Sequence, residues 1–354
     1  MNFYNSFTSC VLLLQFLELM VQPGIGAKVP AIIVFGDSSV DAGNNDYIPT
    51  IGQSNFDPYG KDFEGGKATG RFCNGRLSTD FICEAFGIKS SIPAYLDPAY
   101  SIKDFATGVT FASAGTGLDN ATADVIHVIP FWKELEYFKE YKQKLIIYMG
   151  YKKATRTLRE SVYILSIGTN DFLENYYTIP GGRSSQFTVD EYEKFLIGIT
   201  ENFVWDIYNL GARKIALTSL TAFGCLPIER ATNIMQAHAC REDYNQVARD
   251  YNVKLIALID KLGKEAKGIQ LVYSNVYDSL ADAIARPNLY GFENVDAGCC
   301  GTGKFELGLL CHFAEIFLCE DANKYIFWDS IHYSERMNRV VADYAMKYTF
   351  NRFL

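Results

Sequence analysis

The sequence predicts an α/β fold with three layers, α/β/α, around a central, mainly parallel five-stranded sheet. Short apolar runs recur along the chain, and longer segments with apolar residues at three- and four-residue steps separate them. A strand buried on both faces of a parallel sheet reads as a continuous apolar run, whereas a helix that covers the sheet carries one apolar stripe. Alternation of these two patterns is typical of the layered α/β class.

Five apolar runs are the predicted strands, and they cover residues 31–35, 108–112, 162–167, 214–220 and 269–273. The predicted helices cover residues 77–86, 132–147, 191–210 and 244–262, and a last helix over 335–347 closes the fold. Because no repeat, low-complexity tract or Pro/Ser-rich linker divides the chain, we expect residues 27–354 to form a single domain. A chain of this length has more residues than one core requires. We therefore expect long loops at 44–76 and 286–321 to hold the remainder.

The composition limits the possible partners. Hydrophobic residues make up 49% of the 354, which is enough for a packed core, and Asp and Glu outnumber Lys and Arg by 41 to 33. The net charge of -8 argues against a nucleic-acid partner, because a phosphate backbone requires a basic face. No run reaches the ~18 apolar residues of a membrane-spanning helix, so no transmembrane segment is predicted.

The N-terminus carries the pattern of a secretory signal peptide. An apolar stretch, CVLLLQFLELM at residues 10–20, is followed by the small residues Gly24, Gly26 and Ala27 at a spacing suited to cleavage. We therefore expect residues 1–26 to be a signal peptide and the protein to be secreted and extracellular. No Lys or Arg precedes the stretch, and the alternative is an amphipathic N-terminal helix of an intracellular protein.

The cysteines favour the oxidising compartment. Loss of residues 1–26 would discard Cys10 and leave eight of the nine cysteines, an even number that fits disulfides. We predict one bridge between Cys225 and Cys240 and two among the last four cysteines, with Cys83 as a buried free thiol. These last four, together with a histidine, could instead form a metal site, but their spacing lacks the Cys-x-x-Cys pairs of structural zinc. The residues concerned are Cys299, Cys300, Cys311, His312 and Cys319.

A single N-glycosylation sequon points to the same compartment. Asn120 is followed by Ala121 and Thr122, and the stretch around them is rich in Gly and Asp. We expect Asn120 to lie in a surface loop and to be glycosylated in the secreted protein.

Four short motifs place a Ser, a Gly, an Asn and an Asp–His pair in order along the chain, three of them where predicted strands end. FGDSSVDAGNN follows the first apolar run and contains Ser38, FASAGTG follows the second and contains Gly115, and IGTND follows the third and contains Asn170. Near the C-terminus, DSIH supplies Asp329 and His332. Because ligands bind at the carboxyl ends of parallel strands, we expect these side chains to gather at one edge of the sheet.

This ordered set of Ser, Gly, Asn and His resembles the SGNH hydrolase superfamily, and in particular the plant-type GDSL esterase/lipase family. Further blocks along the chain match the same family: PYG at 58–60, TGRF at 69–72, NGR at 74–76, GCLP at 224–227 and DAGCCG at 296–301. The resemblance implies the flavodoxin-like SGNH hydrolase fold and a carboxylic ester hydrolase of the esterase/lipase type. Its substrate would be a small-molecule ester or an acylated lipid or glycan.

The resemblance also implies a role for each motif residue. Ser38 would be the nucleophile, His332 its general base and then general acid, and Asp329 the group that orients and stabilises the imidazole. The oxyanion would be held by the backbone N–H groups of Ser38 and Gly115 and by the side-chain amide of Asn170. Water then hydrolyses the acyl-enzyme. No metal ion or organic cofactor is implied.

Each motif alone has a simpler structural explanation. A Gly-Asp-Ser after a strand can be only a turn and a helix N-cap, and Gly115 can reflect a need for backbone space. Asn170 and Asp329 can be helix caps, and His332 can be a surface histidine. The conjunction of four motifs at the ends of one sheet favours the enzyme.

Two other functions stay open at this stage. If the cleft excludes water and admits an alcohol, the same groups would make an acyltransferase. A catalytically silent descendant would use the cleft to bind a lipid, glycan or protein.

The chain also has Tyr333 where many members have proline after the histidine, so the loop that holds the base lacks that backbone restraint. The acyl chain, the alcohol and the oligomeric state are not predicted.

Overall fold

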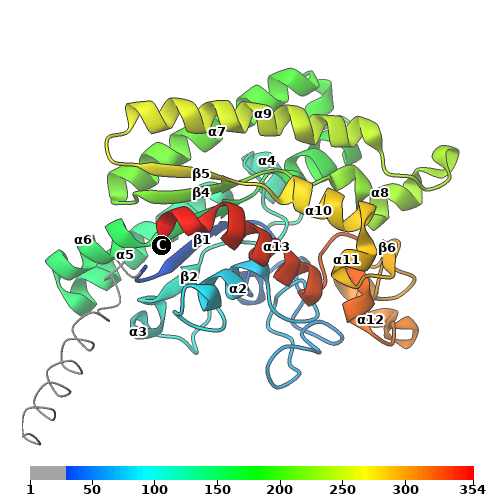
Figure 1. The fold of residues 1–354 in the computed structure, drawn as a ribbon, viewed down its shortest axis with the longest axis horizontal. Coiled ribbons are helices and arrows are strands. Elements are labelled where there is room, and N and C mark those ends of the chain that lie inside the picture. Colours follow the sequence, from blue (N-terminus) through cyan, green and yellow to red (C-terminus); the bar gives the residue numbers. More distant parts are fainter. Residues whose placement is uncertain (1–28) are drawn as a thin grey trace, which may run out of the picture.

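A computed structural model describes residues 29–354. The predicted signal peptide at 1–26 and Cys10 therefore lie outside the described residues. Five strands form one sheet in the order β2-β1-β3-β4-β5, and each neighbouring pair is parallel (Figure 1). The strands are β1 Ile32–Gly36, β2 Gly108–Thr110, β3 Val162–Ser166, β4 Lys214–Thr218 and β5 Gln270–Ser274. The predicted α/β fold with a five-stranded parallel sheet is confirmed.

The long helices confirm the helices predicted from the spacing of the apolar residues. All five predicted helices are present, and their ends differ from the predicted ones by a few residues at most. They are α2 Ser78–Ala85, α5 Phe131–Met149, α7 Val189–Leu210, α9 Glu242–Glu265 and α13 Glu335–Tyr348. The sequence did not predict the shorter helices α3 Ile102–Phe105, α4 Asn120–Asp124, α6 Tyr151–Glu160, α8 Pro227–Thr232, α10 Val276–Ala285, α11 Pro287–Tyr290 and α12 Leu309–Phe313.

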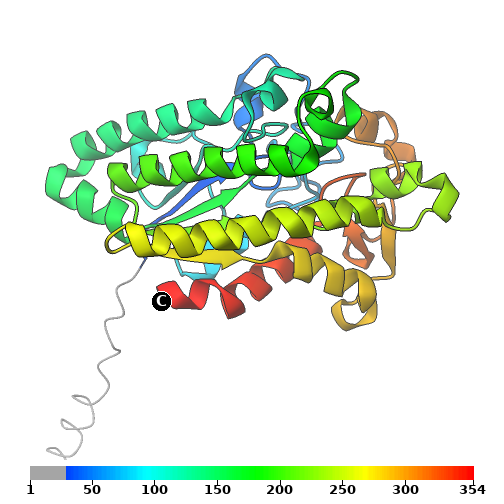
Figure 2. The same cartoon turned by 90° about the horizontal axis from the view of Figure 1, so that it is seen from above.

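Two apolar cores lie on opposite faces of the sheet, because successive side chains of a strand point to opposite sides. In β1, Ile33 and Phe35 belong to the larger core, which contains side chains from α5, α7 and α9. Ile32 and Val34 belong to the smaller core, with side chains from α2 and α13. The three helices α5, α7 and α9 run side by side over one face, and α2 and α13 cover the other (Figures 1 and 2).

A second, two-stranded parallel sheet pairs β6 (Asn294–Gly298) with β7 (Tyr325–Phe327). Strand β6 lies within residues 286–321, where the sequence predicted only a long loop. The chain between the two strands carries two disulfides, Cys299–Cys319 and Cys300–Cys311, and a third joins Cys225 to Cys240. The predicted disulfides are confirmed, and the buried Cys73 and Cys83 are free thiols.

Two further features concern the surface. Asn120 is exposed, but it is the first residue of the short helix α4 rather than part of an irregular loop. Asp119 caps this helix by accepting a hydrogen bond from the backbone of Ala121. Among residues 29–354, no helix is both long enough and apolar enough to span a bilayer.

Candidate active site

Ser38 lies on a tight turn just after the carboxyl end of strand β1, which lies between β2 and β3 in the sheet. The backbone N–H groups of Val40 and Asp41 both donate to the carbonyl of Asp37, which closes the turn. Gly36, the last residue of β1, has φ +146° and passes so close to β3 that a Cβ there would lie 2.0 Å from the carbonyl oxygen of Ser166. Only glycine fits this position, and it lets the chain turn sharply so that Ser38 reaches the sheet edge.

The three side chains expected to form a catalytic triad lie in hydrogen-bonding contact. The Oγ of Ser38 lies 2.8 Å from Nε2 of His332, and Nδ1 of the same ring lies 2.8 Å from Oδ2 of Asp329. The His332 side chain is only 9% exposed. It is therefore not a surface histidine, and its two ring nitrogens connect a hydroxyl to a carboxylate.

Asp329 is a fully buried carboxylate whose two oxygens are both bonded. Its Oδ1 accepts the backbone N–H groups of Ile331 and His332, and its Oδ2 accepts the hydroxyl of Tyr59 at 2.8 Å. Burial alone would raise the pKa of Asp329, but the neighbouring His332 and these hydrogen bonds hold it below its usual value. The carboxylate thus stays ionised and fixed in orientation beside the imidazole.

Tyr59 was missed as a functional residue by the sequence analysis. Its ring is fully buried, and its hydroxyl accepts the backbone N–H of Gly308 at 2.8 Å while donating to Asp329. The hydroxyl thus joins the loop at residues 44–76 and the disulfide-bonded segment to the carboxylate. The only sequence signal was its place in the PYG block.

The loop that holds His332 is restrained although it lacks the proline. The backbone of Tyr333 pairs with Phe327 of β7, and its hydroxyl lies 2.5 Å from Oγ1 of Thr221. Helix α13 begins after this loop and is capped by Ser334, whose side chain accepts the N–H of Met337. Asp329 therefore does not cap this helix.

Gly115 and Asn170 lie on two loops that contact each other. The amide of Asn170 donates to the carbonyl of Thr116 at 2.9 Å, and Asn170 makes no capping bond to the π-helix that follows it, Asp171–Thr178. Gly115 has φ +82°, and a Cβ there would lie 2.4 Å from Ile126. Within the described chain, the backbone N–H groups of Ser38 and Gly115 have no hydrogen-bond acceptor.

Two buried carboxyl groups fasten these loops to one another. Asp41 accepts the N–H groups of Gly43 and Asn44 with one oxygen and that of Ala114 with the other, so it ties the Ser38 turn to the Gly115 loop. Burial raises its pKa to about 6.

Asp171 makes the corresponding connection between the Gly115 and Asn170 loops. It accepts the N–H groups of Leu118 and Asp119 and the hydroxyl of Thr122. Burial raises its pKa to about 7. The sequence analysis quoted both carboxyl groups inside its motifs but gave them no role.

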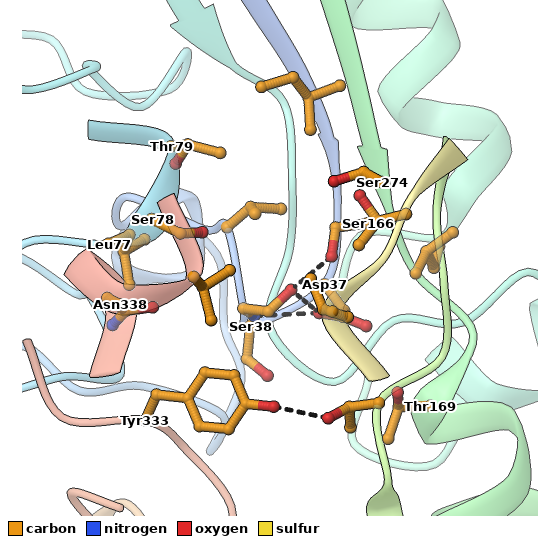
Figure 3. Close-up of a pocket in the computed structure, with 18 of the residues that line it drawn as sticks. Asp37, Ser38, Leu77, Ser78, Thr79, Ser166, Thr169, Ser274, Tyr333 and Asn338 are labelled. Carbon is orange, nitrogen blue, oxygen red and sulfur yellow. Dashed lines mark hydrogen bonds between the residues drawn. The ribbon is translucent and has the colours of Figure 1, made fainter. Parts of the chain in front are cut away.

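A cavity adjoins Ser38 and His332 and extends away from them between the sheet and helices α2 and α13 (Figure 3). Ser38, His332 and Asn170 line it, whereas Gly115 does not. Asp329 is also absent from the lining, because it is buried behind the histidine. A hydroxyl next to an imidazole and an amide at the entrance of a mainly apolar cavity suits acyl transfer to the hydroxyl.

The parallel sheet, with Ser38 after its first strand and a His–Asp pair before its last helix, is the architecture of an SGNH hydrolase. The family model for GDSL-like lipase/acylhydrolases matches residues 32–345. The chain belongs to this family, whose members are carboxylic ester hydrolases.

Three relatives from Arabidopsis thaliana show how far the similarity extends. GDSL esterase/lipase At2g42990 is 56% identical over 93% of this chain and 93% of its own length. GDSL esterase/lipase At4g26790 is 55% identical over 95% of this chain and 96% of its own, and At2g04570 is 56% identical over 92% and 93%. The similarity thus covers nearly the whole chain rather than the motifs alone.

Proposed function

We propose that this protein hydrolyses carboxylic esters with Ser38 as the nucleophile and His332 and Asp329 as the other members of the triad. The observation that carries the proposal is the continuous hydrogen-bonded path from Ser38 through His332 to Asp329. With Nδ1–H directed at the carboxylate, Nε2 is free to take the proton of Ser38 as its oxygen attacks the ester carbonyl. The carboxylate stabilises the imidazolium that results.

The negative charge on the carbonyl oxygen requires donors fixed in advance. The backbone N–H groups of Ser38 and Gly115, which have no acceptor within the described chain, and the amide of Asn170 are the proposed donors. The amide nitrogen of Asn170 carries two protons, so one can donate to Thr116 and the other to the oxyanion. His332 then returns its proton to the leaving alcohol.

Deacylation repeats these steps with a second acceptor. A water molecule gives a proton to His332 as its oxygen bonds the acyl carbon. The bond from that carbon to the Ser38 oxygen then breaks, His332 returns the proton to Ser38, and the acid is released. If an alcohol took the place of water, the product would be a new ester, and the protein would be an acyltransferase. Adding an alcohol to the assay and measuring ester against acid separates these outcomes.

The proposal includes secretion of a single hydrolase domain, residues 27–354, after removal of a signal peptide at 1–26. Three disulfides support an oxidising compartment, because thiols stay reduced in the cytosol. The exposed position of Asn120 at the start of α4 supports glycosylation there.

The test is to label the secreted protein with a fluorophosphonate and to measure hydrolysis of p-nitrophenyl acetate. Ser38→Ala should abolish labelling and lower kcat by about 10⁴-fold or more. Ser39→Ala is the matched control, since it removes the adjacent hydroxyl, which bonds Asp37 and Ser166 instead of His332. Full activity of Ser38→Ala would contradict the proposal. An unreactive, folded wild-type protein would favour the catalytically silent descendant.

A further inference from the structure

The cavity beside Ser38 is large enough for part of a substrate. Its volume is about 110 Å³, and a single water molecule needs about 10–15 Å³ on the same scale. One side is formed by α2 and α13 and the other by the carboxyl ends of the strands, with the space between them open (Figure 3). Among the lining residues, Ser78, Thr79 and Asn338 belong to the helices, and Ser166 and Ser274 to the strands.

The part of the cavity farthest along α13 from His332 is apolar, and the residues that line it are buried. It is lined by side chains from α2, β3, α13 and the C-terminal 3₁₀ helix, Phe350–Phe353, and each of these side chains is at most 5% exposed. From Asn338 to Ala345 helix α13 rises about 10 Å, which matches an extended chain of about eight carbons. The residues at this end are Ile82, Ile164, Val341, Ala345 and Phe350.

The walls between the two ends select for an uncharged ligand. Hydroxyl groups of Ser39, Ser166, Thr218 and Ser274 line this part of the cavity. Of the described residues that line it, only Asp37, His332 and Tyr333 are ionisable, and neither a lysine nor an arginine is among them. An anionic group on the ligand would find no lysine or arginine there and would lose its hydration, which is unfavourable.

We infer that this cavity binds the acyl chain of the ester, as a straight, uncharged chain of medium length whose end contacts Ala345 and Phe350. The inference rests on the proposed function. In the two-step reaction the alcohol must leave and water must enter while the acyl group stays bound to Ser38. A cavity whose inner end is buried suits the acyl group, because this group stays bound to Ser38 through both steps. Ala345 is then the residue that limits chain length.

The first test compares p-nitrophenyl acetate, octanoate and palmitate as substrates. Each methylene that enters the apolar end should raise kcat/KM by about three- to fourfold, so octanoate should be preferred over acetate. Ala345→Leu fills that end and should lower kcat/KM for octanoate by about tenfold or more, with acetate changed by less than about twofold. Val341→Ala enlarges the same end and should shift the preference towards palmitate.

The matched control is Ala342→Leu. Ala342 is also buried on α13, at 1% exposed, but it does not line the cavity. This variant adds the same volume to the same helix and should keep the wild-type ratio of octanoate to acetate. The same ratio in wild type, Ala345→Leu and Val341→Ala would overturn the inference, even with esterase activity intact.

A second test does not depend on catalysis. The folded Ser38→Ala protein is titrated calorimetrically with 2-decanone, a neutral ketone that keeps the chain and carbonyl of an ester but cannot be hydrolysed. We expect it to bind about tenfold or more tightly than 2-butanone, and we expect Ala345→Leu in the same background to remove the difference. Equal binding of both ketones would overturn the inference. An absence of esterase activity in the wild-type protein, with this binding preference intact, would contradict only the proposed function.

Discussion

Tyr59 shows how a residue of a distant loop restrains the carboxylate that faces His332. Its hydroxyl is the donor to Oδ2 of Asp329, the oxygen that also faces Nδ1 of His332. A hydrogen bond to a charged group contributes about 1.5–3 kcal/mol. Without it, the carboxylate would keep its two backbone donors on Oδ1 but lose the restraint on the oxygen that holds the imidazole.

Tyr59→Phe should therefore lower kcat by about tenfold and leave KM for p-nitrophenyl acetate nearly unchanged. Thermal stability should also fall, by about 1–3 kcal/mol, because the N–H of Gly308 loses its buried acceptor. Steady-state kinetics and a melting curve on the same preparation check both effects. A folded variant with wild-type kcat would show that Oδ1 alone orients the histidine.

Asn170 allows the proposed oxyanion role to be separated from a structural one. If its amide stabilises the oxyanion, Asn170→Ala should lower kcat by about 10²–10³-fold, with little change in KM, because the donor matters most as charge develops. Loss of the bond to Thr116 alone would cost about 1 kcal/mol of stability. Normal kcat together with a lowered Tm would remove Asn170 from the catalytic site.

The sequence predicted the motif residues because each follows or precedes a recognisable element. Ser38 and Asn170 come just after apolar runs, and parallel strands end at the same edge of the sheet. Tyr59 gave no such signal, since 270 positions separate it from Asp329 and no periodic pattern surrounds it. Contacts of this kind depend on how a long loop folds back, which local sequence does not determine.

At the scale of elements, burial decides what the sequence reveals. The five strands of the central sheet were found because both of their faces are covered, which makes their apolar runs continuous. Strand β6 has the sequence NVDAG and is mostly only half-buried, and β7 has only three residues. The sequence of β6 is neither an apolar nor an alternating run, and the apolar β7 is too short to be recognised as a strand, so this sheet was not predicted.

The cysteines give a prediction that also tests the N-terminus. Cys73 and Cys83 are buried, and burial raises the pKa of Cys83 to about 12, so neither should react with iodoacetamide in the native protein. After unfolding without reductant, mass spectrometry should count two thiols per mature chain. Three thiols would show that Cys10 is retained. Free thiols in the segment 299–319 would contradict the disulfides described above.

At the scale of the whole molecule, buried carboxyl groups surround the turn that carries Ser38. Glu134 is fully buried, accepts the N–H of Gly36, and has a pKa raised well above its usual value by burial. Burial, with the nearby Asp171 and Asp37, raises the pKa of Glu174 to about 8. Glu134 and Glu174 each have one buried oxygen without a hydrogen-bond partner in the described chain. In both groups burial thus favours the protonated form in the folded protein.

This arrangement predicts a protein that is more stable at mildly acidic pH than at pH ~8. An acid whose pKa is higher in the folded than in the unfolded state stabilises the fold fully below its unfolded pKa of ~4, and that contribution is lost as the pH rises through the folded pKa. For Glu174 the window runs from its ordinary value, 4.5, to about 8. Each such group changes the free energy of unfolding by up to ~1.4 kcal/mol per pH unit inside its window.

We expect Tm to fall between pH ~5 and pH ~8, and Glu174→Gln to reduce that fall by about 2–5 °C, because the amide cannot ionise. Glu265→Gln is the control, since Glu265 is exposed at the end of α9.

The lowered pKa of Asp329 acts in the opposite direction, because its stabilisation is lost only as the pH falls below ~4. The two effects therefore occupy different pH ranges, and a Tm profile measured upward from pH ~5 reports the buried carboxyl groups whose pKa is raised. A profile that rises towards pH ~8, or equal slopes for wild type and Glu174→Gln, would show that Glu174 is ionised in the fold.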